Sequence, residues 1–212
     1  MFNMDRVVTD LKIQRKNKNR TNVYLDGEFG FGIANTLALT LHVGQGLSEK
    51  QIADMLKRDE FEAAFHRADH FLGYKPRTSG EVTRKLLMLK YNDETVHEVI
   101  EKLTEQNLLD DKRFATQWVE ERSNSKPKGK KVLAMELRQK KVDPEIIQEV
   151  LQKVDNQGLA LKSAREYAQK TIELDWTIFR KKISGYLIRR GFEYSDIAPI
   201  IEGVWAEKNH EK

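Results

Sequence analysis

The stretch LRQKKVDPEIIQEVL, residues 137–151, contains a leucine, a basic cluster, a short break and an apolar pair, and LIRRGFEYSDIAPII, residues 187–201, repeats that order. An earlier copy precedes both along the chain. The matching apolar positions are Leu86, Tyr91, Val96 and Ile100 in the first copy, Leu137, Val142, Ile147 and Leu151 in the second, and Leu187, Phe192, Ile197 and Ile201 in the third. A shift of about fifty residues between copies is typical of helical repeat arrays.

Each copy is predicted to contain three helices, because apolar residues recur at helical spacing from about residue 58 onward. Capping signals mark several helix starts: Thr78 with Glu81, Asp143 before Pro144, and Ser195. The sequence therefore predicts a mainly α fold of tandem three-helix repeats that form an elongated curved array.

In the first part of the chain, apolar and polar residues alternate as is typical of β-strands. VVTDLKI, residues 7–13, alternates in polarity, and TNVYLDGEFGFGI, residues 21–33, contains an Asp26-Gly27 pair that suits a two-residue hairpin turn. This alternation predicts aromatic residues on one face and glycines on the other: Tyr24, Phe29 and Phe31 against Gly30 and Gly32. We expect a small antiparallel β-hairpin or sheet, followed by short helices at 35–43 and 48–56, the second capped by Ser48.

These patterns predict a division into four segments. Residues 1–57 form the N-terminal β-hairpin with short helices. Residues 58–107 and 108–154 form the first two three-helix repeats, and residues 155–212 form a third repeat with a C-terminal tail.

The composition restricts the class of protein. The chain has 212 residues, of which 33% are charged, and it contains no cysteine, so disulfides and cysteine-ligated zinc are excluded. The N-terminus lacks the apolar core of a signal peptide, and residues 33–43 are too short and too polar to span a bilayer. We expect a soluble, cytoplasmic monomer. The net charge of +4 is a mild basic bias whose meaning depends on clustering.

Several patterns that resemble catalytic or cofactor motifs do not meet the requirements of those sites. His66 and His70 are four residues apart on one helix but lack a third ligand and are expected on a solvated face. The glycines at 30 and 32 lie inside a predicted strand instead of at a strand-to-helix turn. The PKGKK stretch, residues 127–131, lacks the upstream glycine and the hydroxyl of a phosphate-binding loop. We predict no metal, no cofactor and no enzyme active site.

Clustered positive charge is the strongest functional signal. The clusters fall at equivalent places in the second helices of the repeats, so we expect them to line one side of the array, a surface suited to a long polyanion or an acidic groove. A merely solvated helix face is the alternative for any single lysine. Trp118, Trp176 and Trp205 are expected to pack in cores or at helix ends. The binding candidates are Lys126, Lys128, Lys130, Lys131, Arg138, Lys140, Lys141, Arg180, Lys181, Lys182, Arg189 and Arg190.

Residues 60–205 closely resemble the RecX family of bacterial regulators of the RecA recombinase. The resemblance is most specific in LDDKRFA, residues 109–115, and in RGF, residues 190–192. KNKNRTNVYLDGEFGFGI, residues 16–33, is similar to the longer form of the family found in Gram-positive bacteria. The chain departs from the family at KKV, residues 140–142, where relatives often have Lys-Gly-Ile or Lys-Gly-Val, which removes a permissive helix end.

The resemblance implies a function by contact instead of chemistry. It implies a non-enzymatic modulator, chiefly a negative regulator, that lies in the groove of the RecA–DNA filament and limits filament extension, ATP hydrolysis, strand exchange and coprotease activity in DNA repair and the SOS response. Direct contact with single- or double-stranded DNA is an open part of that expectation. A RecA-independent nucleic-acid-binding repeat protein is the alternative, and a hydrolase or nuclease ranks last.

Overall fold

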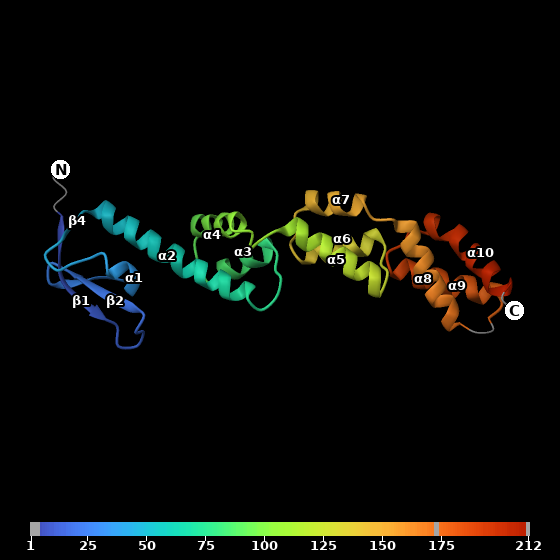
Figure 1. Ribbon diagram of the computed structural model, residues 1–212, viewed down its shortest axis with the longest axis horizontal. Coiled ribbons are helices and arrows are strands. Elements are labelled where there is room, and N and C mark those ends of the chain that lie inside the picture. The colour runs from blue at the N-terminus through green and yellow to red at the C-terminus, as the bar shows by residue number, and fades with distance from the viewer. Residues whose placement is uncertain (1–4, 172–173, 211–212) are drawn as a thin grey trace. The chain divides into compact units, whose positions relative to one another are not determined.

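The computed structural model describes residues 5–171 and 174–210, with side chains up to residue 208 (Figure 1). The chain divides into two compact units. One comprises Met1–Lys75 and Thr83–Glu105, and the other comprises Pro76–Val82 and Gln106–Lys212. Each unit is described separately below.

The first unit opens with a four-stranded antiparallel sheet of order β3-β2-β1-β4. The predicted hairpin is confirmed as β2 and β3, because Asp26 and Gly27 connect them with φ angles of 53° and 87°. The predicted helix over residues 35–43 is only one turn, α1. The elements are β1 (Arg6–Ile13), β2 (Arg20–Leu25), β3 (Glu28–Ala34), α1 (Asn35–Ala38) and β4 (Gly46–Leu47).

The prediction that Tyr24, Phe29 and Phe31 share one face of the hairpin is wrong for Phe31. Tyr24 pairs with Phe29 across the ribbon, and their rings meet edge to face at 6.1 Å between centroids. The next pair is Val23 with Phe31, so Gly30 is an extra residue on β3. This irregularity turns Phe31 into the core, where it is 7% exposed, while Phe29 is 59% exposed.

One helix, α2 (Glu49–Leu72), follows the sheet, so the expectation of separate helices at 48–56 and from residue 58 is wrong. No glycine or proline interrupts this range, and a helix continues through residues that do not break it. Ser48 caps α2 as predicted and forms a capping box with Gln51. The predicted boundary after residue 57 therefore falls inside a continuous helix, and the four-segment division stays a prediction.

Buried Asp59 joins α2 to the sheet. Its carboxylate accepts a hydrogen bond from Arg20 Nη2 at 2.7 Å and one from the backbone N–H of Ala34 at 2.7 Å. Arg20 also donates to the carbonyl of Gly32 at 2.6 Å. Because the carboxylate is satisfied by both a charge and a backbone donor, the long helix is fixed to the strands near its midpoint.

The remaining helices come in groups of three, as predicted, with the second half of α2 as the first helix of the first group. The mainly helical, three-helix-repeat fold predicted from the sequence is confirmed. The helices are α3 (Ser79–Met88), α4 (Asp93–Glu105), α5 (Asp111–Ser125), α6 (Lys130–Gln139), α7 (Pro144–Gln152), α8 (Asn156–Lys170), α9 (Trp176–Arg189) and α10 (Tyr194–His210).

The repeated sequence pattern corresponds to the same type of turn at the end of each second helix. The backbone N–H of Val142 donates to the carbonyl of Leu137 at 3.1 Å, and that of Phe192 donates to the carbonyl of Leu187 at 3.2 Å. Tyr91 and Leu86 make the same bond at 3.3 Å. This is the Schellman motif, in which the two bonded residues also pack as an apolar pair.

Predicted helix starts are mostly confirmed. Thr78 and Glu81 cap each other, and the carboxylate of Asp143 accepts from the backbone N–H of Glu145 with Pro144 in the first turn. Ser195 is not an N-cap, because α10 already begins at Tyr194. In the described residues 5–171 and 174–210, no helix is both long and apolar enough to cross a membrane.

Candidate functional site

The twelve basic candidates fall into two groups according to what their side chains contact. Five have partners within the second unit, namely Lys128, Lys131, Lys140, Arg180 and Arg190. The other seven form no side-chain hydrogen bond or ion pair with the described residues, and we call them the free cations: Lys126, Lys130, Arg138, Lys141, Lys181, Lys182 and Arg189. Lys128, Lys131 and Lys140 pair with carboxylates, whereas Arg180 and Arg190 bond neutral oxygens and keep their charge.

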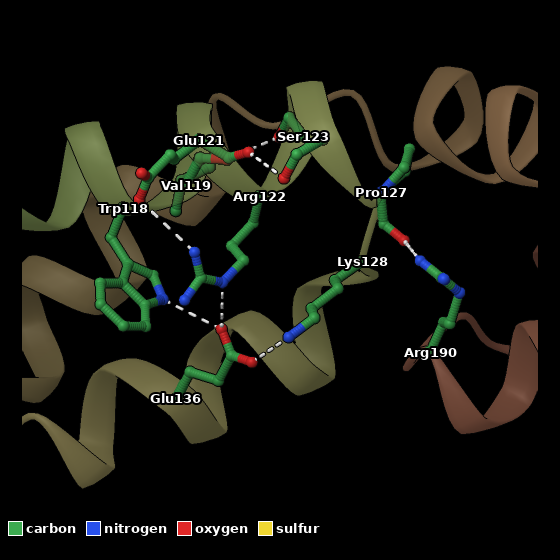
Figure 2. A network of polar contacts seen from close by, with 10 residues as sticks. Trp118, Val119, Glu121, Arg122, Ser123, Pro127, Lys128, Glu136 and Arg190 are labelled. Atoms are coloured by element: carbon green, nitrogen blue, oxygen red, sulfur yellow. Dashed lines mark hydrogen bonds and ion pairs between the residues drawn. The ribbon is translucent and has the colours of Figure 1, made fainter.

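Glu136 on α6 gathers several of the basic and aromatic side chains (Figure 2). Its carboxylate accepts from the indole Nε1 of Trp118 at 3.0 Å and contacts Arg122 Nε at 3.4 Å. Lys128 donates to its other oxygen. The three donors come from α5 and from the loop before α6, so the carboxylate connects the first two helices of this group.

The charge of Glu136 is stabilised by these neighbours. Burial raises the pKa of its carboxyl, but the hydrogen bonds from Lys128 and Trp118 and the charges of Lys128 and Arg122 outweigh burial and leave the pKa below its ordinary value of 4.5. Glu136 is therefore an ionised structural anion at neutral pH, and Lys128 is its counterion instead of a free binding group.

Trp118 lies between two cations. The Arg122 guanidinium is 4.1 Å from the ring centroid, and the Lys140 ammonium is 5.2 Å from it. Lys140 also forms an ion pair with Glu81 at 3.3 Å. Both contacts hold Lys140 against the protein, so its main role is to stabilise the fold. The prediction that Trp118 packs is confirmed, since it lies against the α5–α7 core.

Arg190 joins two three-helix groups at a backbone contact. Its carbonyl accepts from the N–H of Gly129 at 2.8 Å, and its Nη1 donates to the carbonyl of Pro127 at 3.0 Å (Figure 2). Lys131 adds an ion pair with Glu193 at 3.0 Å. The start of α6 is therefore held against the turn between α9 and α10.

The same type of contact occurs at the start of α3. The Thr78 hydroxyl donates to the carbonyl of Lys140 at 2.5 Å, just as the Gly129 N–H donates to the equivalent Arg190 carbonyl. Carboxylate or amide oxygens complete both contacts: Asp111 accepts from the N–H of Ser79 at 2.8 Å, and Asn156 accepts from that of Lys130 at 3.1 Å. The sequence does not predict these joints, because each partner lies about sixty residues away or in another helix.

Lys126 follows α5, and half-exposed Lys130 begins α6, whereas the other free cations are exposed on α6 and α9 or directly after α6. Arg138 is exposed near the end of α6, and exposed Lys141 follows that helix. Lys181 and Lys182 are exposed in the first half of α9, and Arg189 is its last residue. Seven of the twelve candidates therefore have no side-chain hydrogen bond or ion pair with the described residues.

Two aromatic residues that the sequence analysis did not assign to a site line a pocket in the third group. Trp176 packs on the core as predicted, through Trp205 at 5.5 Å between ring centroids, but it also borders a pocket of about 310 Å³ together with Tyr194. The remaining lining residues are Thr177, Arg180, Lys181 and Ser184, all on α9. Their spacing of three and four residues is the signal that could have revealed a shared helix face.

The histidine pair does not form a metal centre with other residues of the described chain. His66 and His70 are exposed on α2, and the ring centroids of His70 and Tyr74 are 5.1 Å apart. Among residues 5–171 and 174–210, no three potential ligands of the His, Cys, Asp or Glu type come together.

Tandem three-helix groups define a class of helical repeat proteins, and in this chain the second and third groups are joined through a helix start. Family profiles match along the chain: the RecX regulatory protein N-terminal domain at residues 6–48, the first three-helix domain of RecX at 64–103, and the second at 110–151.

Known proteins align with nearly the whole chain. Regulatory protein RecX of Clostridium acetobutylicum is 29% identical and covers 97% of this chain and 99% of its own. Its counterpart in Bacillus cytotoxicus is 30% identical over 97% of this chain and 80% of its own. A crystal structure of a regulatory protein RecX aligns with a TM-score of 0.66 at 28% identity, over 93% of this chain and 99% of that one. The chain belongs to the RecX family of regulatory proteins, which are not enzymes.

Proposed function

We propose that this protein is a negative regulator of the RecA recombinase that acts by binding the RecA–DNA filament in its helical groove. Bound there as a cytoplasmic monomer, it limits filament extension and so lowers ATP hydrolysis, strand exchange and coprotease activity in DNA repair and the SOS response. The observation that carries the proposal is family membership over nearly the full length, together with the free cations on α6 and α9.

The electrostatics support contact through the free cations instead of the whole basic set. An exposed cation without an internal partner loses little when it pairs with an external anion, whereas Lys128 or Arg190 would first have to leave its own partner. A filament that contains DNA offers a regular array of phosphates, and complementary charge accelerates such encounters. We therefore assign Arg138, Lys141, Lys181 and Lys182 as the central contact residues.

The experiment measures RecA's single-stranded-DNA-dependent ATP hydrolysis while this protein is titrated in substoichiometric amounts. We expect wild-type protein to suppress hydrolysis at far less than one copy per RecA protomer, because one bound molecule that stops filament extension prevents the addition of many protomers. Reversal of Arg138, Lys141, Lys181 and Lys182 to Glu should abolish that suppression.

A matched variant controls for net charge. Lys16, Lys50, Lys75 and Lys170 are exposed, and reversing all four to Glu changes the total charge equally. Suppression by this control variant must persist. If wild-type protein leaves hydrolysis unchanged, the proposed function is wrong. If both variants lose suppression alike, the assignment of the contact residues is wrong.

A further inference from the structure

The pocket at the start of α9 combines two kinds of recognition group in one small space. Its volume is about 310 Å³, at the lower end of the range of small-ligand sites. Two aromatic rings, two cations and two hydroxyls line it. The lining residues are Trp176, Thr177, Arg180, Lys181, Ser184 and Tyr194.

The polar side of the pocket follows one stripe of α9. Thr177, Arg180, Lys181 and Ser184 are separated by three, one and three residues, so they lie on one face of the helix across two turns. Core residue Phe179 points to a different side and is fully buried. Two hydroxyls and two cations on one stripe provide hydrogen-bond donors and positive charge for a single anionic group.

The aromatic side is held in place from behind. Trp176 lies 5.5 Å from Trp205 between ring centroids, and Trp205 lies 4.9 Å from Phe179. This chain of ring contacts connects the pocket wall to the core of the third group and restricts the motion of the indole. A fixed aromatic wall loses little entropy when another planar ring stacks on it.

Arg180 links the two sides. Its Nη2 donates to the Tyr194 hydroxyl at 3.1 Å, and its guanidinium carbon is 5.9 Å from the Trp176 ring centroid. Tyr194 is 49% exposed at the first position of α10. The guanidinium is thus positioned between the two rings and keeps other donors for a ligand, since only one is used by Tyr194.

We propose that this pocket binds a nucleotide, with the base stacked on Trp176 and the phosphate bound by Arg180 and Lys181. Thr177 and Ser184 donate further hydrogen bonds to phosphate or sugar oxygens. The nucleotide is either one unit of a single strand or a free mononucleotide, because both offer the same base and phosphate.

An acidic peptide fits the pocket less well. A carboxylate needs the cations but gains nothing from two aromatic walls, whereas every nucleobase has a face that stacks on an aromatic ring. The two acids adjacent in sequence to the lining residues have other partners: Asp175 accepts the N–H of Ile178 as the N-cap of α9, and Glu193 pairs with Lys131. The aromatic residues therefore favour a ligand that has both a planar ring and an anionic group.

The test uses the full chain without any recombinase and follows tryptophan fluorescence, which a stacked base quenches. The probes are a short single-stranded oligonucleotide, the same oligonucleotide with abasic sites, a free mononucleotide and an oligoglutamate peptide. We expect quenching by the oligonucleotide or the mononucleotide, and little by the abasic strand or the peptide. Saturation by the oligonucleotide at far lower nucleotide concentration identifies a single strand as the source, and equal saturation identifies free nucleotides.

Variants locate the effect. Trp176→Phe should remove the quenching, while Trp118→Phe should retain it because that indole belongs to the Glu136 contacts of another group. Thr177→Glu adds an anion to the stripe at an exposed position and should weaken binding at least tenfold, whereas Thr116→Glu, on an exposed position of α5, should not. Trp176→Ala should weaken binding by about 5- to 150-fold, the range of one lost stacking contact.

Equal affinity for the intact and abasic strands would refute base stacking and overturn the proposal, and so would equal affinity for oligoglutamate. Quenching that persists in Trp176→Phe would place the ligand elsewhere and would overturn it too. The inference goes beyond the proposed function. The two share Lys181, but the test is separate because no recombinase takes part in it. Failure here leaves the hydrolysis experiment unaffected, and failure of that experiment leaves this one unaffected.

Discussion

Lys141 and Gly191 occupy the same position in consecutive three-helix groups, the left-handed residue that follows the end of the second helix. Their φ angles are 63° and 89°. Lys90, with φ of 67°, occupies the corresponding position after α3. Glycine adopts this conformation without strain, whereas a lysine brings its Cβ too close to the backbone. The Schellman turn therefore forms in the second group in spite of the residue at its left-handed position.

Replacing Lys141 by Gly should stabilise the protein. Relief of the left-handed strain amounts to about 1–2 kcal/mol, partly offset by the greater freedom of glycine in the unfolded chain, so we expect a net gain of about 0.5–1 kcal/mol. Urea unfolding followed by far-ultraviolet circular dichroism measures it. Lys126→Gly is the control, because Lys126 has a φ of −151° and no such strain. An unchanged or lower stability of Lys141→Gly would show that the turn is not strained.

Gly129 should not tolerate even a methyl group. Its φ of −74° suits any residue, but a Cβ there would lie 2.2 Å from the carbonyl oxygen of Gly191. We expect Gly129→Ala to lose about 1–3 kcal/mol of unfolding free energy, because the backbones of two groups would have to separate and the bond to Arg190 would lengthen.

Gly203→Ala is the matched control for this substitution. Gly203 lies inside α10, and a Cβ there would meet nothing within 4 Å. Alanine favours the helix over glycine by about 1 kcal/mol, so this variant should be more stable than wild type. The two substitutions should change the unfolding free energy in opposite directions. This difference separates the crowding at Gly129 from a general effect of alanine. A Gly129→Ala variant as stable as wild type would mean that the joint yields without cost.

Glu136→Gln should lower stability by about 1–2 kcal/mol at pH 7, because Lys128 and Arg122 lose their charged acceptor. The pKa of Glu136 is lowered in the folded state, so the stabilisation is fully present above the unfolded-state value and is lost as pH falls through the folded value. The difference between wild type and variant should therefore shrink in urea titrations from pH 7 towards pH 3.

Glu120→Gln on α5 controls for the loss of an exposed carboxylate, since Glu120 is exposed and has no hydrogen bond or ion pair with the described residues. It should leave stability almost unchanged at either pH. A gap between wild type and Glu136→Gln that stays constant with pH would contradict the role of the ionised carboxylate.

Asp59→Asn should loosen the attachment of α2 to the sheet. The amide keeps the volume but removes the charge that Arg20 pairs with, and we expect a loss of about 2–3 kcal/mol. Hydrogen exchange of the β2 and β3 amides gives a local measurement, in which protection should fall. Asp54→Asn, an exposed residue of the same helix, should leave these amides protected. Unchanged protection in Asp59→Asn would mean that apolar packing alone holds the helix.

The sequence was sufficient for the repeats because their signature is local. In each copy, a leucine and an apolar residue five positions later form the two ends of a Schellman turn. The turn is present in all three copies. Caps such as Ser48 and Asp143 are also local, since the side chain bonds to a backbone group within three residues. The hairpin turn at Asp26 and Gly27 follows from the same kind of short-range preference.

The sequence failed where an outcome depended on residues distant along the chain or on register. The extra Gly30 on β3 reversed the face of Phe31, because one added residue exchanges the two sides of a strand. Similarly, Ser195 was a plausible cap, but α10 began one residue earlier, at Tyr194.

The properties of the candidate site also divide into those that the sequence determined and those that only the tertiary structure decided. The sequence by itself determined the mainly helical three-helix repeats, the N-terminal hairpin and the family, because helical periodicity, caps and turns depend on neighbours in the chain. Only the tertiary structure decided which cations are free, because Lys140 finds Glu81 and Arg190 finds Pro127 across about sixty residues. It also decided that Trp176 and Tyr194 border one pocket, because two helices had to pack before their side chains could meet.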